Sequence, residues 1–216
     1  MTPYINIHTH HLSQDSGVFL FNNRFGFDKD FFLEKYFSVG IHPWDANLQI
    51  SFSEFEGMIQ NQNCLAIGEC GLDKVKGPDL EIQKAIFIFQ LDFAVKYQLP
   101  VIIHCVKAFD ELIEICKPYY SKVLLIIHGF NKSSELAKQL IDKGFYISWH
   151  HSVFNKPEYD FSLFSLNNIF LETDNYENIS IVDVYKNAAL RFHHSENDLK
   201  EKIYTNFTTL FKKYGR

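Results

Sequence analysis

Eight short runs of apolar residues recur along the chain, and they constrain its fold more than any other feature of the sequence. Most of them are continuously apolar rather than alternating, which is typical of strands that are covered on both faces. The runs span Tyr4 to His8, Val18 to Asn22, Phe37 to Ile41, Leu65 to Glu69, Val101 to His104, Val123 to His128, Phe145 to Trp149 and Ile169 to Thr173. From the fourth run onward, several of the gaps between runs carry a helical pattern.

The clearest helical pattern lies between Asp79 and Tyr97, where apolar residues recur at spacings of four, three and four from Ile82 onward. That spacing places them on one face of a helix, with Asp79 as the capping residue. We expect helices over Asp79 to Tyr97, Ser53 to Gln60, Ala108 to Lys117, Ser133 to Lys143, Ile181 to His193 and Ser195 to Lys213.

Alternating strands and helices predict an α/β fold with a parallel sheet. We expect a distorted TIM-type (β/α) barrel of seven or eight strands with its active site at the C-terminal strand ends, because the 216 residues fall short of the roughly 250 typical of that fold. Only about nine residues separate the first two runs, fewer than a parallel crossover needs. The second strand is therefore expected to be antiparallel, displaced or outside the barrel. A doubly wound open sheet is the alternative.

No low-complexity tract divides the chain, so we expect a single domain over residues 1–216. The net charge of −5, with no basic run longer than Lys212-Lys213, argues against a large nucleic-acid footprint. The chain shows neither a basic leader followed by an apolar stretch nor an apolar segment of membrane-spanning length, which predicts a cytoplasmic protein with no membrane partner. The oligomeric state is not predictable from these features.

Histidines are concentrated at the predicted strand ends. Eight of the ten histidines lie at or just beyond the end of a run, namely His8, His10, His11, His42, His104, His128, His150 and His151. In parallel α/β folds the loops at these ends converge on the active site. Two carboxylates share this location, because Glu69 ends the fourth run and Asp174 follows the last one.

The spacing His8-x-His10 suits metal binding, because residues two apart on a strand point to the same side. Imidazole and carboxylate ligands are typical of a catalytic divalent site, most commonly of zinc, although manganese and other first-row metals accept the same ligands. The sequence thus predicts a metal centre assembled from several strand ends.

The sequence also resembles the TatD family of metal-dependent hydrolases. The resemblance covers nearly the whole chain, in the order NIHTH, GIHPW, AIGECGLD, QLPVIIHC, LIIHGF, LETD and NFTTLF. It implies a barrel with two divalent metal ions (Zn, Mn or Mg) and a metal-dependent deoxyribonuclease activity, often at the 3′ end of DNA. One ion would be held by His8, His10, Glu69 and Asp174, and the other by Glu69, His104 and His128, with Glu69 as the bridge.

Within this resemblance, we expect the catalytic residues to be Glu69, as the bridging ligand, and Asp174, as both ligand and general base. Lys107 stands where the family usually has arginine and is expected to contact phosphate as a point charge. His42 and His150 are further candidates for substrate binding. Asn6 replaces the usual aspartate of the first motif, which is expected to weaken support for the neighbouring histidines.

Three functions fit these observations. The leading one is a phosphodiesterase that acts on the ends of single-stranded DNA, on short oligonucleotides or on a small phosphodiester. The second keeps the metal centre but hydrolyses amides or lactones, as related barrels do. The third is a catalytically idle barrel that serves as a binding module, which measured metal affinity would distinguish from the enzymes.

Overall fold

The computed structural model describes residues 2–26, 35–49 and 51–215. These residues group into two compact units. Unit 1 comprises residues 1–21 and 127–210, and unit 2 comprises residues 22–126 and 211–216. The divisions fall inside the strands β2 (Gly17–Arg24) and β6 (Leu125–Ile127).

The eight strands follow one another in the sheet in chain order, from β1 to β8. Besides β2 and β6 they are β1 (Tyr4–Thr9), β3 (Phe37–Gly40), β4 (Cys64–Asp73), β5 (Val101–Val106), β7 (Tyr146–Trp149) and β8 (Ile169–Leu171). The pairs β1–β2 and β7–β8 in unit 1, and β3–β4 and β4–β5 in unit 2, are parallel. This strand order confirms the TIM-like α/β barrel class, with eight strands. It excludes the doubly wound alternative, in which the strand order reverses at a switch point.

All of the described helices except α5 lie where the sequence patterns place them. They are α1 (Phe52–Gln60), α2 (Leu80–Tyr97), α3 (Phe109–Cys116), α4 (Ser134–Asp142), α5 (His151–Phe154), α6 (Ile181–Phe192) and α7 (Glu196–Leu210), with single 3₁₀ turns at Pro43–Asp45, Lys117–Tyr119, Phe161–Leu163 and Leu166–Asn168. Side chains of Asp79 and Ser195 accept backbone amides at the starts of α2 and α7, as expected. None of the described helices has both the length and the apolar character needed to cross a bilayer.

The expectation that the second strand is antiparallel, displaced or outside the barrel is wrong. β2 lies between β1 and β3 in the sheet and pairs with β1 in parallel, with Tyr4 opposite Gly17 and Thr9 opposite Phe21. The connection needs no helix. The seven residues 10–16 between the two strands reach roughly 24 Å when extended, whereas a six-residue strand is only about 20 Å long. An extended loop can therefore return the chain to the start of a parallel neighbour.

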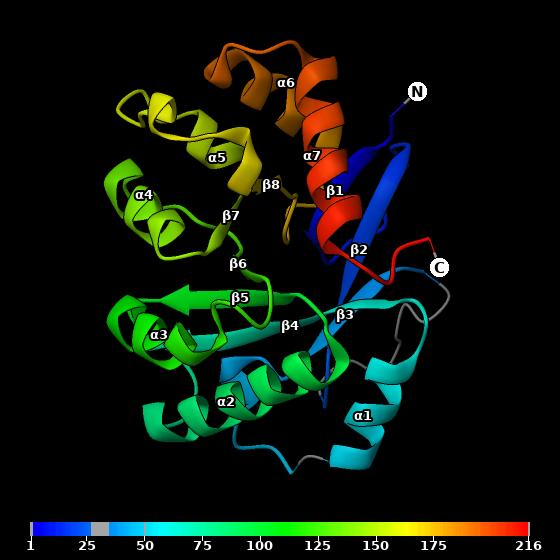
Figure 1. Cartoon of the computed structure of the whole chain (residues 1–216), viewed down its shortest axis with the longest axis vertical. Coiled ribbons are helices and arrows are strands. Elements are labelled where there is room, and N and C mark those ends of the chain that lie inside the picture. The colour runs from blue at the N-terminus through cyan, green and yellow to red at the C-terminus, as the bar shows by residue number, and fades with distance from the viewer. Residues whose placement is uncertain (1, 27–34, 50, 216) are drawn as a thin grey trace. The chain divides into compact units, whose positions relative to one another are not determined.

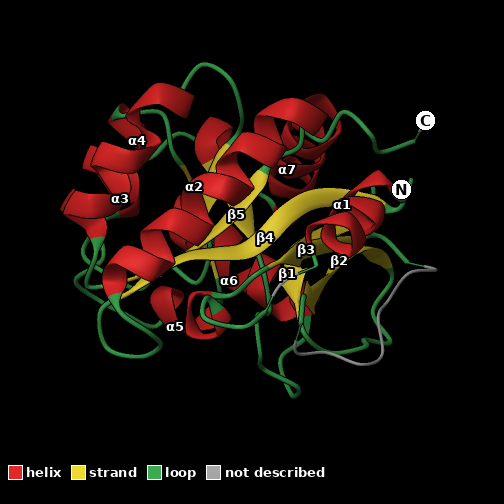
Figure 2. Cartoon of the chain, turned by 90° about the horizontal axis from the view of Figure 1, so that it is seen from below, coloured by secondary structure: helices red, strands yellow, loops and turns green. Residues whose placement is uncertain are grey.

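Aromatic rings fill much of the core of each unit. In unit 1, Trp149 is fully buried and its ring packs against those of Tyr159, Phe161, Phe164 and Phe192. Helices α6 and α7 pack on each other and on β1 (Figure 1). In unit 2, α2 packs along β4, as Figure 2 shows. These helices and aromatic rings pack against the strands whose ends carry the histidines.

Asn206 ties α7 to the segment that leads into β8. Its Nδ2 donates to the backbone carbonyls of Leu166 (2.7 Å) and Ile169 (3.4 Å), and the side chain is buried. Asn206→Ala leaves these carbonyls without their donor, so we expect the free energy of unfolding to fall by about 1–3 kcal/mol. Urea denaturation measures this change, with Asn197→Ala on an exposed position of the same helix as the control. Equal stability of the two variants would contradict this role.

Candidate functional site

In unit 1, the end of β1 and the residues after β8 are joined through their backbones. Thr9 forms a parallel bridge with Asp174, the Asp174 amide donates to the His8 carbonyl (3.0 Å), and the His10 amide donates to the Asp174 carbonyl (3.2 Å). The side chains of the three residues His8, His10 and Asp174 also lie close together. The Nε2 atoms of His8 and His10 are 3.6 and 3.8 Å from Asp174 Oδ1. His8, on β1, and His10, just beyond its end, therefore face one carboxylate, as their spacing predicts.

His128, directly after β6, completes this cluster. Its ring centroid lies 4.3 Å from that of His8, and both histidines are buried. Single ligand atoms of His8, His128 and Asp174 all lie within 4.8 Å of one another. We call His8, His10, His128 and Asp174 the unit 1 cluster.

Glu172 is a residue of this region that the sequence analysis did not single out. Its side chain is fully buried, and Oε1 accepts the Gly129 amide (2.7 Å) and lies 3.4 Å from His128 Nδ1. The carboxylate therefore lies beside the His128 imidazole, where it favours a proton on Nδ1. The sequence carries a signal for it, since Glu172 and Asp174 are two residues apart, as are His8 and His10.

Two candidate residues have left-handed backbones. Among the described residues, four other than glycine have positive φ, and two of these, Gln98 and His193, end helices α2 and α6. The others are Lys107 (φ 54°), directly after β5, and Asp174 (φ 53°). Such conformations are costly for residues with a Cβ and concentrate at functional sites.

In unit 2, a second cluster forms around Glu69 on β4. Glu69 Oε1 lies 3.2 Å from His42 Nε2 and 2.8 Å from His104 Nδ1. Single ligand atoms of all three residues lie within 4.8 Å of one another. We call His42, Glu69 and His104 the unit 2 cluster. His42 was expected to bind substrate, and the structure places it beside the same carboxylate oxygen as His104.

Hydrogen bonds to neighbouring residues fix this second cluster. The Glu69 amide donates to Asn22 Oδ1 (2.9 Å), and the Ile41 amide, next to His42, donates to Gln90 Oε1 (2.7 Å). Asn22 and Gln90 are both buried. Neither contact is predictable from the sequence, because each joins residues distant along the chain.

Asp73, the last residue of β4, contacts both its own loop and the unit 2 cluster. Its Oδ1 accepts the amides of Val75 and Lys76, which is the loop contact, while Oδ2 accepts Trp44 Nε1 (2.7 Å) and lies 3.3 Å from His104 Nε2. Burial raises the pKa of this carboxyl, but these hydrogen bonds outweigh burial and hold the pKa well below its usual range. His104 therefore lies between two carboxylates.

Burial lowers the pKa of the His42 imidazole, and the neighbouring Glu69 carboxylate offsets only part of that effect. Burial thus favours the neutral imidazole, which is the form that binds metal ions. Of the other expected substrate contacts, Lys107 is exposed. His150 is buried, and its Nδ1 accepts the Ser152 amide at the start of α5.

Asn6 contacts none of the histidines directly in the hydrogen bonds described for it. Its Nδ2 donates to Thr173 Oγ1 (2.8 Å), and its Oδ1 accepts the Thr173 amide (3.2 Å). Thr173 immediately precedes Asp174, so the amide of Asn6 anchors the backbone that carries this carboxylate. An aspartate here would lack the donor for the first of these bonds.

Both clusters have the chemistry of divalent metal sites. Each combines imidazole nitrogens with a carboxylate, and their ligand atoms lie close enough together to contact one ion. Glu69 is buried, which favours neutralising its carboxylate charge with a cation. The residues present therefore fit the bound metal that the sequence predicts, in each unit separately.

Several known proteins are similar to this chain in sequence. The 3′-5′ ssDNA/RNA exonuclease TatD of Citrobacter koseri is 31% identical over 114 residues, covering 51% of this chain and 44% of that protein. The uncharacterized metal-dependent hydrolase YcfH of Escherichia coli K12 is 30% identical over 117 residues, covering 52% of this chain and 43% of that protein. The chain spans about half the length of the curated relatives it matches.

The fold has counterparts among solved structures. YJJV, a TatD homolog from Escherichia coli K12, superposes with a TM-score of 0.76 at 19% identity, covering 97% of this chain and 98% of that chain. The family model described as TatD related DNase matches residues 27–212. That range includes Glu69, His104, His128 and Asp174, while His8 and His10 precede it. The chain therefore belongs to the TatD related DNase family.

Proposed function

We propose that this protein is a divalent-metal-dependent phosphodiesterase that removes nucleotides from the 3′ end of single-stranded DNA or short oligonucleotides. One observation carries the proposal: each unit gathers histidines and a carboxylate from separate strand ends, with ligand atoms within 4.8 Å of one another. The family and the name of the Citrobacter koseri relative support nucleic acid as the substrate. A cytoplasmic location stays a prediction.

We propose that His8, His10, His128 and Asp174 hold one ion, and that Glu69, His104 and His42 hold another. The role of Glu69 as a bridge between ions stays a prediction from the resemblance. When bound, divalent ions supply Lewis acidity that lowers the pKa of water and stabilises charge on phosphoryl oxygens.

Side chains of the protein accept the proton, position the ligands and contact the phosphate. The Asp174 carboxylate accepts the proton of the attacking water, for which its partly exposed side chain is accessible. Asn6 and Thr173 hold the backbone of Asp174, and Glu172 and Asp73 orient His128 and His104. Lys107 contacts the phosphate of the substrate with its exposed ammonium group.

A substrate panel tests this proposal. The purified protein is supplied with zinc, manganese or magnesium and given 3′-labelled single-stranded DNA, the matching RNA, duplex DNA, a generic phosphodiester and simple amides. We expect release of the labelled nucleotide from single strands and little from duplex. Hydrolysis of amides with none of phosphodiesters would contradict the proposal and favour an amidohydrolase. A protein that binds none of the metals would contradict both and favour an idle module.

A further inference from the structure

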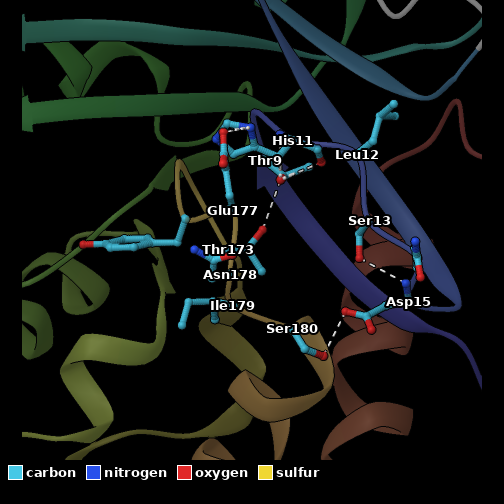
Figure 3. Close-up of a pocket in the computed structure, with 12 residues that line it drawn as sticks. Thr9, His11, Leu12, Ser13, Asp15, Thr173, Glu177, Asn178, Ile179 and Ser180 are labelled. Atoms are coloured by element: carbon cyan, nitrogen blue, oxygen red, sulfur yellow. Dashed lines mark hydrogen bonds and ion pairs between the residues drawn. The ribbon is translucent and has the colours of Figure 1, made fainter.

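A pocket of about 310 Å³ lies in unit 1, between the loop that joins β1 to β2 and the segment that follows β8. Figure 3 shows side chains of both segments around it. Thr9 and Thr173 line it, and the Thr173 hydroxyl donates to Thr9 Oγ1 (3.0 Å). Thr9 lies between His8 and His10, and Thr173 precedes Asp174. The pocket therefore adjoins the unit 1 cluster.

The pocket is suited to a neutral ligand. No lysine or arginine is among the described residues that line it, and its carboxylates already have partners. Asp15 Oδ2 accepts the Ser180 hydroxyl (2.9 Å) and the Ile181 amide (3.0 Å), and Glu177 Oε1 lies 3.5 Å from His11 Nδ1. A phosphate group would meet carboxylates here with no lysine or arginine to balance its charge. The volume is at the lower end of small-molecule sites and suits a single nucleoside.

Tyr176 provides an aromatic surface at this pocket. Tyr176 is among the residues that line the pocket, and it is 43% exposed. The ring also packs against two histidines, with centroids 5.2 Å from His150 and 4.6 Å from His151. The backbone amide of Ser152 in turn fixes the His150 ring by donating to its Nδ1. The ring of Tyr176 is thus held in place while much of it stays accessible, which is the arrangement on which nucleic-acid bases stack.

We propose that this pocket receives the base of the terminal nucleotide, which stacks on Tyr176, and that His150 and His151 act as positioning residues for that ring. The inference rests on the proposed function and assigns the nucleoside end of its substrate. The base then has a place of its own, in the neutral pocket beside the unit 1 cluster. A free nucleic-acid end with an unpaired base suits this pocket, because a base within a duplex would first have to leave its pair and its stack to enter it.

The test compares two labelled single-stranded oligonucleotides that differ only in the terminal nucleotide, which carries a base in one and is abasic in the other. We expect the native protein to show a KM about tenfold lower for the oligonucleotide with the base, with kcat little changed. Tyr176→Ala should abolish this difference, Tyr176→Phe should retain it, and His151→Ala should reduce it. Tyr204→Ala, on α7 and away from the pocket, serves as the control and should retain it.

The outcomes separate the inference from the function on which it rests. Equal KM values for both oligonucleotides in the native protein, or a full difference in Tyr176→Ala, would overturn the base pocket while leaving the phosphodiesterase intact. Absence of hydrolysis of both oligonucleotides by the native protein with every metal would overturn the proposed function and the inference together. Because the result is a ratio between two substrates, a general loss of folded protein cannot mimic it.

Discussion

Replacing Asp174 by asparagine is expected to lower kcat for the hydrolysis of single-stranded DNA by about 10²–10⁴-fold. Asparagine keeps the size of the side chain but removes the negative charge, and with it the proton acceptor and the metal ligand. The backbone should tolerate the change, because Asp174 has a φ of 53° and asparagine is among the residues that adopt this conformation most readily. The loss therefore reports on chemistry rather than on folding. Steady-state kinetics with 3′-labelled DNA measure it.

The control for this experiment is Asp183→Asn, an exposed position in the first turn of α6. It removes the same charge within unit 1 without touching the unit 1 cluster, so its activity should match that of the native protein. Thermal unfolding of both variants checks that each is folded. An Asp174→Asn protein that is folded, binds metal and hydrolyses DNA at the native rate would refute the role of this carboxylate.

Replacing Glu69 by glutamine is expected to have a comparably large effect through the unit 2 cluster. One oxygen of Glu69 lies within 3.2 Å of both the His42 and the His104 imidazoles, and the side chain is buried. Glutamine preserves its volume but removes the charge that attracts a cation to these histidines. We expect the metal content to fall and kcat/KM for single-stranded DNA to decrease about a hundredfold or more.

The matched control for Glu69 is Glu114→Gln, an exposed glutamate of α3 in the same unit whose ion pair with Lys117 is at the surface. Exposed pairs contribute little to stability, so this variant should keep native metal content and activity. Elemental analysis and kinetics are measured on the same samples. Native metal content in Glu69→Gln would show that this carboxylate holds no ion.

Much of the fold is predictable from the sequence, because continuous apolar runs and helical periodicity each select one kind of element. The run from Val101 to His104 becomes β5, and the pattern from Asp79 to Tyr97 becomes α2. The error at β2 has a physical cause. Strand direction depends on whether the connecting loop is long enough to return, and residues 10–16 are long enough without a helix. The short helix α5 carries no periodicity, since four residues are too few to show any.

The site is predictable in its ligand types but not in its supporting contacts. Histidines at strand ends are visible in the sequence, and so are the two carboxylates, Glu172 and Asp174, that follow the last strand. The hydrogen bonds from Asn6 to Thr173 and from the Glu69 amide to Asn22 join segments that only the fold brings together. The left-handed backbones of Lys107 and Asp174 leave no mark on the sequence, because neither residue is glycine.

The central claim is that the histidine and carboxylate clusters hold divalent ions on which phosphodiester hydrolysis depends. The most direct test measures bound metal by elemental analysis and DNA hydrolysis on the same sample, before chelation, after chelation and after addition of zinc, manganese or magnesium. We expect about two ions per chain in the active protein, loss of hydrolysis on chelation and its return with metal. Full hydrolysis by a protein from which all metal has been removed would contradict it.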